Sequence, residues 1–275
     1  MIPADIQQIV AQALHEDLGS GDLTAALIPA EQSLQARILS RESGILCGQP
    51  YVEATFNALS SALQIDWQVS EGDPIEPEQI LCTIQGPARA LLSAERCALN
   101  FLQTLSGTAT TVHQYAQLLE GRHTRLLDTR KTIPGLRQAQ KYAVRIGGGY
   151  NHRLGLFDGI LIKENHIAAC GGIRAALNAA KALAPALTRT EIEVENLTQL
   201  EEALSAGVDM ILLDNFSLDT LQEAVTRVAG SIPLEASGNI GLHNLSAVAA
   251  TGVDFISVGS LTRNLRSLDL SLRYY

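Results

Sequence analysis

The chain has 275 residues, of which 46% are hydrophobic, 18% charged and 4% aromatic, and its formal net charge is −9. This composition excludes a disordered chain, and the acidic balance argues against a nucleic-acid partner. No apolar run reaches the ~18 residues of a membrane helix, and the N-terminus lacks a secretory pattern. The four cysteines show no metal-ligand spacing. We therefore expect a cytoplasmic protein with buried, reduced cysteines and no membrane partner.

Residues 1–105 are expected to form a mixed α+β domain. A one-sided apolar pattern over residues 6–14 predicts a helix that ends near Gly19. Two alternating apolar runs later in this segment predict short strands. The pattern from residue 88 to 120 is helical, with a predicted break at Gly107 because glycine weakens a helix interior.

From about residue 126 the chain repeats a different pattern. Six short apolar runs end in polar residues: LLDTRKT, GILIKENH, EIEVEN, MILLDN, PLEASGN and FISVGS. Helical stretches rich in Ala and Leu separate the last four runs, which indicates βα units. Six such runs favour a closed or incomplete α/β barrel of the TIM type over residues 106–275. The extreme C-terminus is expected to pack back on the N-terminal domain.

Half of the basic residues lie in one window of the sequence. Residues 122–174 contain 10 of the 20 Lys and Arg but three acidic residues, so this window carries +7 and the remainder carries −16. A cationic island in an acidic protein is typical of a site for a small polyanion. The structural alternative is a solvated helix face.

Polar residues follow each predicted barrel strand, at the end where such barrels bind their ligands. Cations come first in the chain, carboxylates next and small residues last. Cations suit carboxylates and pyrophosphate, carboxylates suit ribose hydroxyls or Mg²⁺, and small residues let backbone N–H groups approach a phosphate. The candidates are Arg130, Lys131, His152, Arg153, Lys163, Glu195, Asp214, Ser237, Gly238, Gly259 and Ser260.

Longer motifs surround these residues. They are LLDTRKTIPGLR, GGGYNHRLGLFDGILIKENHI, EIEVEN, ILLDNF, EASGNI and DFISVGSLT, with EDLGSGDLT and ERCALNFLQTLSGTAT nearer the N-terminus. Over residues 10–262 the chain resembles the quinolinate phosphoribosyltransferase family, the decarboxylating nicotinate-nucleotide pyrophosphorylases. The resemblance implies transfer from phosphoribosyl pyrophosphate to quinolinate with Mg²⁺, which gives nicotinate mononucleotide, pyrophosphate and CO₂ for NAD biosynthesis. It also implies a homodimer, or a higher oligomer built from it, with active sites shared between subunits.

The resemblance assigns the acid and the leaving group to cationic residues. It implies that Arg130, His152, Arg153 and Lys163 hold the quinolinate carboxylates, and that Arg96 joins them from the neighbouring subunit. The lysine after Arg130, Lys131, would face the pyrophosphate.

The remaining roles concern the sugar, the metal and the 5′-phosphate. The resemblance implies that Glu195 and Asp214 face the ribose and Mg²⁺, and that they act with Lys131 and Lys163 as catalytic residues. The phosphate would be bound by Ser237, Gly238, Asn239, Gly259 and Ser260. Asn239 departs from the family pattern, in which many members carry glycine.

Three alternatives remain on the sequence alone. A related phosphoribosyltransferase acting on another anionic acceptor would differ at Arg130, His152 and Arg153. A non-catalytic barrel would only bind a phosphorylated metabolite. Lys163, at a strand end, could instead form a Schiff base as in aldolase-type barrels.

Glu193 lies on the same strand face as Glu195, two residues later. We expect Glu193 to be buried and paired inside the barrel.

Overall fold

The structure is a computed structural model that describes residues 2–275. The chain forms two compact units that alternate along the sequence. Unit 1 contains the chain up to His113, together with Thr132–Gly148 and Leu261–Tyr275, and unit 2 contains Gln114–Lys131 and Gly149–Ser260. The segment 106–275 therefore contributes to both units.

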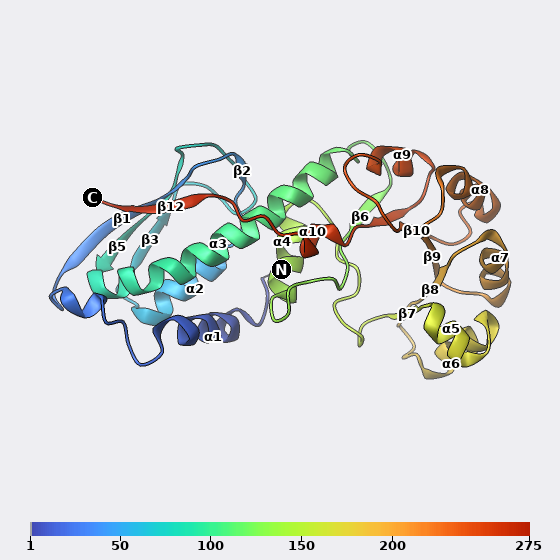
Figure 1. Cartoon of the computed structure of the whole chain (residues 1–275), viewed down its shortest axis with the longest axis horizontal. Helices are drawn as coiled ribbons and strands as arrows, with labels where there is room; N and C mark the ends of the chain where they lie inside the picture. The colour runs from blue at the N-terminus through green and yellow to red at the C-terminus, as the bar shows by residue number, and fades with distance from the viewer. Residues whose placement is uncertain (1) are drawn as a thin grey trace. The chain divides into compact units, whose positions relative to one another are not determined.

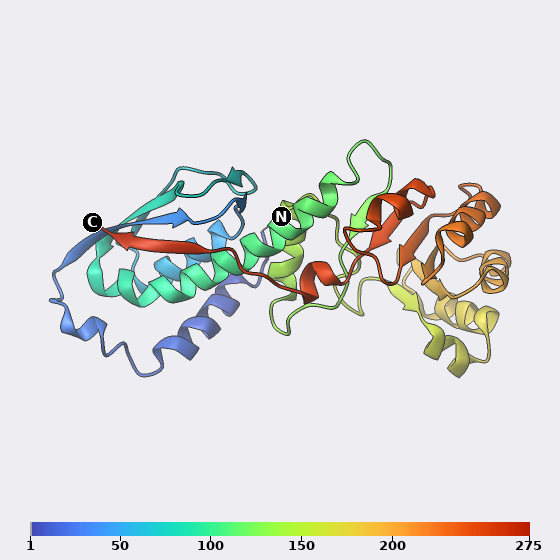
Figure 2. The same cartoon turned by 45° about the horizontal axis from the view of Figure 1, so that its top comes forward.

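Unit 1 is built on an antiparallel sheet of four strands in the order β12-β1-β5-β3. The last strand of the chain pairs with the first one in register, Ala36 opposite Tyr274, and the two run side by side in Figure 1 and Figure 2. The strands of the unit are β1 (Ser33–Ser40), β2 (Gly44–Ile45), β3 (Gln64–Trp67), β4 (Pro74–Ile75), β5 (Ile80–Pro87) and β12 (Leu270–Tyr274).

Helices α2 (Gln49–Leu59) and α3 (Ala88–Gln117) share an apolar core with this sheet, and α1 (Ile6–Leu18) packs with them in a second apolar cluster. In α1, Ile6, Val10 and Leu14 are buried, and the helix ends at Gly19, as the pattern predicts. Burial of one such side chain contributes about 1.5–3 kcal/mol. The helical elements that lie wholly or mostly in unit 1 are α1 (Ile6–Leu18), η1 (Ala25–Leu27), α2 (Gln49–Leu59), α3 (Ala88–Gln117), α4 (Arg137–Ile146) and α10 (Ser260–Arg263).

The predicted break at Gly107 is wrong, since α3 runs through this residue without interruption. A Cβ atom at Gly107 would lie 2.0 Å from the backbone oxygen of Arg266. The glycine therefore allows the C-terminal segment to pass against the helix backbone, and the helix continues because its other residues favour it. Neither α3 nor any other helix within residues 2–275 is long and apolar enough to cross a membrane.

Unit 2 contains the predicted α/β barrel in its incomplete form. Six parallel strands follow the order β6-β11-β10-β9-β8-β7, and β6 and β7 form the two edges. A helix follows each of the strands β7 to β10 (Figure 1). The strands are β6 (Arg125–Leu127), β7 (Ile160–Ile162), β8 (Thr190–Val194), β9 (Met210–Asp214), β10 (Leu234–Ser237) and β11 (Phe255–Ser257), and the helices are α5 (Glu164–Cys170), α6 (Ile173–Leu183), α7 (Leu197–Ala206), α8 (Leu218–Val228) and α9 (Leu245–Ala250).

The cysteines follow the expectation with one exception. All four are unpaired thiols, and Cys47, Cys82 and Cys97 are buried. Cys170 is exposed, so its predicted burial is wrong. It ends the short helix α5, in which no residue is buried. The apolar residues before it in the sequence, Ala168 and Ala169, suggested burial, but in the structure this helix lies on the surface.

Candidate active site

A buried carboxylate fixes the loop that precedes β7 against the end of β6. Asp128 follows β6 directly and is fully buried. One of its oxygens accepts a hydrogen bond from Asn151 Nδ2 at 2.6 Å, and the other accepts one from the His152 backbone N–H at 2.9 Å. Hydrogen bonds to a buried carboxylate are strong, so Asp128 sets the position from which His152 and Arg153 extend.

Two guanidinium groups lie close together at this position. Burial and the charge of Arg130 both lower the pKa of Arg153, which places the two cations within electrostatic reach. Arg153 Nη1 donates to the carbonyl oxygen of Gly159 at 3.1 Å. The Nε atom of Arg130 is buried and has no hydrogen-bond partner among the described residues. Two adjacent cations with an unused buried donor suit a ligand that carries two negative charges.

Lys163 follows β7 and forms an ion pair on the neighbouring strand. Its Nζ lies 2.7 Å from Glu193 Oε2, and Glu193 is buried and paired, as its strand position predicts. Burial raises the pKa of Glu193, while the hydrogen bond from Lys163 acts in the opposite direction. An ion pair stabilises the charged ammonium, whereas a Schiff-base lysine reacts as the neutral amine. The geometry therefore favours a charged Lys163 that binds anions.

His152 lies between two buried glutamates. Its Nε2 is 2.9 Å from Glu191 Oε2 and 3.4 Å from Glu235 Oε2. Burial disfavours the charged imidazole, whereas the hydrogen bond with Glu191 and the negative charges of both carboxylates favour a proton on Nε2 and raise the pKa of His152. Burial and the charge of Glu235 raise the pKa of Glu191 to about 7. The cluster therefore retains protons near neutral pH.

Two further carboxylates end the middle strands. Glu195 follows β8 and is exposed, while Asp214 closes β9 and is half-buried. Asp214 Oδ2 accepts a hydrogen bond from Asn215 Nδ2 at 2.7 Å, and the charge of Asp214 reaches Glu193, whose pKa it helps to raise. Accessible carboxylate oxygens on adjacent strands are donors that Mg²⁺ accepts when substrate oxygens and water complete its shell. The donor set fits this ion.

After β10 and β11, glycine residues let the backbone lie close to neighbouring residues, and a larger side chain would not fit there. Gly238 has φ +96°, and a Cβ there would lie 2.2 Å from Asn215 Oδ1. Asn239 has φ +49°, a conformation that glycine and asparagine adopt most readily, so asparagine is a tolerated exchange at this position. A Cβ at Gly259 would lie 2.9 Å from Lys131 Cδ. Lys131 therefore packs over the small residues that follow β11.

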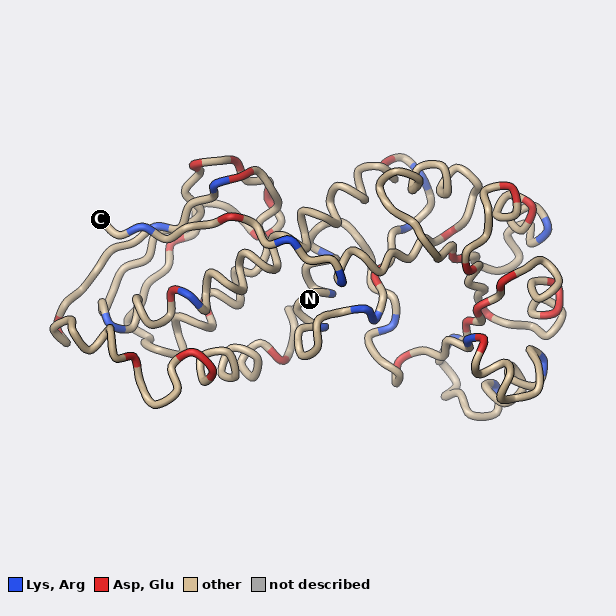
Figure 3. The backbone as a smooth tube through the Cα atoms, in the orientation of Figure 1, with Lys and Arg blue, Asp and Glu red and all other residues tan. Residues whose placement is uncertain are grey.

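The structure groups most of the predicted residues within unit 2. The set at the carboxyl ends of its strands and in the loop before β7 is Arg130, Lys131, His152, Arg153, Lys163, Glu195, Asp214, Ser237, Gly238, Asn239, Gly259 and Ser260. Arg96 is exposed on α3 in unit 1. The cationic window of the sequence is also divided, because its residues on α4 belong to unit 1. Lys and Arg positions are marked along both units in Figure 3.

The sequence reasoning did not assign three buried acids to the site. They are Asp128, Glu191 and Glu235, which contact His152. A signal for two of them existed. Glu191 shares the strand face of Glu193 through the two-residue period, and Glu235 interrupts the apolar run PLEAS, where a charge needs a partner.

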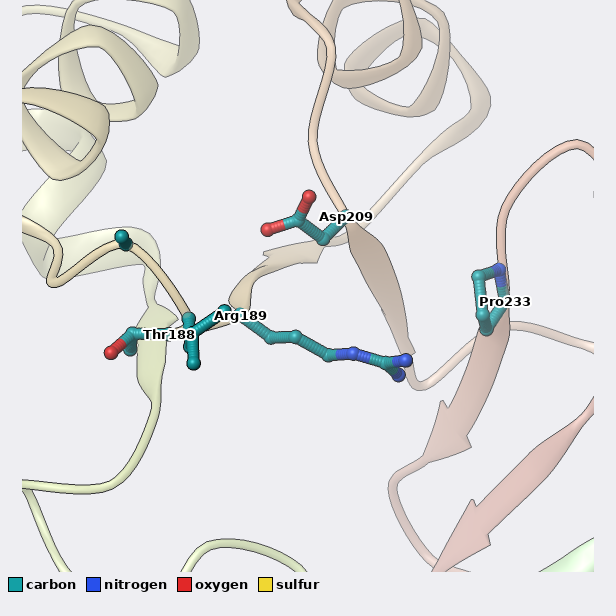
Figure 4. Close-up of a pocket in the computed structure, with 6 residues that line it drawn as sticks. Thr188, Arg189, Asp209 and Pro233 are labelled. Atoms are coloured by element: carbon teal, nitrogen blue, oxygen red, sulfur yellow. The ribbon is translucent and has the colours of Figure 1, made fainter.

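A separate cavity of about 400 Å³ lies at the opposite ends of the strands (Figure 4). Its residues immediately precede β8, β9 and β10, and the Arg189 side chain extends toward Pro233. Asp209 accepts a hydrogen bond from the Thr190 backbone N–H at 2.8 Å and so links two strand starts. Polar residues at this end of a barrel serve stability, whereas ligands bind at the other end.

An incomplete parallel barrel with cations, carboxylates and small residues in sequence around its carboxyl end defines an α/β-barrel enzyme that binds a phosphorylated polyanion. Comparison with known families gives the narrower class. The family model described as quinolinate phosphoribosyl transferase, C-terminal domain, matches residues 108–273, and the N-terminal domain model matches residues 22–106. The chain belongs to the quinolinate phosphoribosyltransferase family.

Individual relatives agree over almost the whole chain. The chain is 44% identical over 257 residues to the probable nicotinate-nucleotide pyrophosphorylase [carboxylating] of Bacillus subtilis, which covers 94% of this chain and 89% of the relative. It is 36% identical over 289 residues to quinolinate phosphoribosyltransferase [decarboxylating] 1b of Nicotiana tabacum, covering 98% and 82%. The solved nicotinate-nucleotide pyrophosphorylase of Francisella tularensis superposes with a TM-score of 0.96 at 45% identity, covering 100% and 98%.

Proposed function

We propose that the chain transfers the phosphoribosyl group of phosphoribosyl pyrophosphate to quinolinate and releases CO₂, which yields nicotinate mononucleotide and pyrophosphate. The observation that supports this most directly is the pair of Arg130 and Arg153, two adjacent cations with a buried, unused donor. Quinolinate carries two neighbouring carboxylates and so supplies the two charges that this pair lacks. Lys163 extends the cationic surface along β7.

Glu195 and Asp214 would hold Mg²⁺ in this proposal and would also face the ribose. When bound, Mg²⁺ neutralises negative charge on a departing pyrophosphate. Lys131 adds a positive charge beside the small residues at Gly259, where it can contact the same leaving group. Breaking the bond to pyrophosphate builds positive charge on the sugar, and the two carboxylates stabilise that charge.

Small residues after the late strands would bind the 5′-phosphate. Gly238 and Asn239 both have positive φ values, and this backbone form exposes N–H groups where a Cβ atom would block the approach of a ligand. The phosphate would contact Ser237, Gly238, Asn239, Gly259 and Ser260.

Positioning supplies much of the remaining chemistry. The pyridine nitrogen of quinolinate is a weak nucleophile, so the arginine pair contributes by holding it against C1 of the sugar. After this nitrogen has bonded to C1 it is positively charged and stabilises the carbanion that remains on the adjacent ring carbon when the carboxylate leaves as CO₂. That carbon then takes a proton from water. This sequence of events requires no dedicated general base.

The assembly and the compartment also belong to this proposal. We infer a homodimer in which Arg96 of the partner subunit reaches the acid, since an exposed arginine on α3 is free to serve a neighbouring chain. The unpaired cysteines fit a reducing compartment, the cytoplasm.

The test is product formation with a panel of acids. Quinolinate should be converted to nicotinate mononucleotide in the presence of phosphoribosyl pyrophosphate and Mg²⁺. Nicotinate lacks the second carboxylate and should react at least ~100-fold more slowly, since one arginine loses its charge-assisted partner. Phthalate lacks the nitrogen and should inhibit without reacting. Asp214→Asn provides an inactive control, and Glu201→Gln on the outer helix α7 provides an active one. Equal rates with nicotinate and quinolinate would overturn the proposal in favour of another acceptor.

A further inference from the structure

Both ring nitrogens of His152 are engaged by the protein itself. Nε2 faces Glu191 and Glu235 at 2.9 and 3.4 Å. On the other side of the ring, the Arg153 backbone N–H donates to Nδ1 at 2.7 Å. A ring held on both sides has no nitrogen directed at an external carboxylate.

These contacts fix the tautomer of the ring. An N–H directed at Nδ1 makes this nitrogen a hydrogen-bond acceptor, so the ring carries its proton on Nε2, where that proton faces the two carboxylates. The same argument opposes a metal ion at Nε2, because a metal-bound imidazole normally carries its proton on the other nitrogen and donates it.

The glutamates would repel an acid if both were charged. Glu191 is 6% exposed and Glu235 is 0% exposed, and neither oxygen of Glu235 has a hydrogen-bond partner among the described residues beyond its ion-pair contact with His152. Leaving both ionised beneath a site for a dianion is costly. The pKa of Glu191 is raised to about 7 by burial and by Glu235, so a proton shared within the cluster lowers this cost below that pH.

We propose that Glu191 and Glu235 are positioning residues for acid binding. They hold the His152 ring, and Nδ1 of that ring orients the backbone of Arg153, so that its guanidinium is presented to the acid beside Arg130. His152 then acts through Arg153 and does not contact the substrate. The inference rests on the proposed function for the identity of the acid.

The charged groups around the ring come from four segments. Asp128 after β6 holds the His152 backbone, Glu191 on β8 and Glu235 on β10 face Nε2, and Arg153 follows in the chain. Of these groups, Glu191 is the one whose pKa burial and Glu235 raise to about 7, so the loss of its proton changes the charge beneath the acid. Quinolinate affinity should therefore fall as the pH rises through about 7, by roughly tenfold for one added negative charge.

The first test is a pair of variants measured by calorimetry at pH 6 and pH 8.5. Glu235→Leu removes a carboxylate that anchors the ring, and the dissociation constant for quinolinate should rise at least ~10-fold while that for phosphoribosyl pyrophosphate stays within about twofold. Glu235→Gln removes the negative charge that helps to raise the pKa of Glu191, and the pH dependence of quinolinate binding near pH 7 should flatten. Glu202→Gln, an exposed exchange on α7, should keep the wild-type profile. An unchanged profile in Glu235→Gln, or equal losses for both ligands in Glu235→Leu, would overturn the inference.

The second test observes the ring directly. Nitrogen NMR of ¹⁵N-histidine-labelled protein, with the His152 signals assigned through His152→Asn, should show the Nε2–H tautomer in the free protein, and quinolinate should not change it. Protonation of Nδ1 on adding quinolinate, or loss of the Nε2 proton on adding Zn²⁺, would overturn the inference. The free-protein spectrum requires no turnover. A protein that shows this tautomer but does not convert quinolinate would contradict only the proposed function.

Discussion

Arg153 performs two separate tasks at the residue scale. Its backbone N–H meets His152, and its guanidinium donates to the Gly159 carbonyl while lying near Arg130. Two hydrogen bonds therefore fix the position of Arg153, while the positive charge of Arg130 repels its guanidinium group. Arg153 should therefore bind a carboxylate strongly, because the anion offsets the repulsion between the two arginines and accepts hydrogen bonds from the unused N–H groups.

The Arg153→Lys variant should distinguish the contribution of positive charge from that of the planar guanidinium group to quinolinate binding. Lysine keeps the positive charge but lacks the planar fork that holds a carboxylate through two parallel bonds. Quinolinate affinity should fall by at least ~10-fold, the size of one charge-assisted hydrogen bond. Affinity for phosphoribosyl pyrophosphate should remain the same. Calorimetric titration of each ligand checks this, and equal losses for both would show that Arg153 does not bind the acid.

Strand-end residues could be found from sequence because their position alone selects them. Lys163 and Glu195 follow apolar runs, and the structure places them at the carboxyl ends of β7 and β8. The partners of His152 could not be found in this way. Glu191 and Glu235 lie within strands separated by more than 40 residues of sequence, and only the parallel order of the sheet brings them together.

Element by element, the βα rhythm predicted the strands of unit 2 because each one alternates with a helix that is visible in the apolar pattern. The strand order of unit 1 could not be predicted from the sequence. Its strand order depends on pairing β12 with β1, and no local signal encodes a partner more than 200 residues away. The prediction of a break in α3 at Gly107 was wrong for the same reason, because the segment that requires the glycine is the backbone at Arg266, which is distant in the sequence.

Gly107→Ala should therefore destabilise the protein, although alanine is the better helix former by about 1 kcal/mol. The added Cβ would overlap the Arg266 carbonyl, and overpacking of this kind costs typically ~1–3 kcal/mol. Urea unfolding should show a net loss. Asn100→Ala, at an exposed position of the same helix, should give a small gain. A gain for both variants would mean that α3 does not need a glycine at this contact.

At the scale of the whole molecule, the proposed reaction would combine residues of two subunits. The barrel residues lie in unit 2 and Arg96 lies in unit 1. A two-fold dimer with exchanged arginines would have two identical composite sites, each combining Arg96 of one subunit with Lys163 of the other. This arrangement is the part of the proposal that mixing two inactive variants can test.

Arg96→Ala and Lys163→Ala homodimers should both be nearly inactive. Unfolding them together and refolding equal amounts should make about half of the dimers hybrid, each with one site that carries both changes and one that carries neither. About a quarter of the wild-type rate should then return. The control is each variant refolded alone, which should remain inactive. A mixture that stays inactive while hybrids are shown to form would place Arg96 in its own subunit's site or in none.

The release of CO₂ tests the central claim most directly, because decarboxylation distinguishes this enzyme from phosphoribosyltransferases that act on other acids. The protein should be incubated with phosphoribosyl pyrophosphate, Mg²⁺ and quinolinate labelled in the carboxylate next to the ring nitrogen. One labelled CO₂ should appear for each pyrophosphate, and the nucleotide should be unlabelled. Pyrophosphate release with the label retained in the nucleotide, or no pyrophosphate release with quinolinate, would contradict the account.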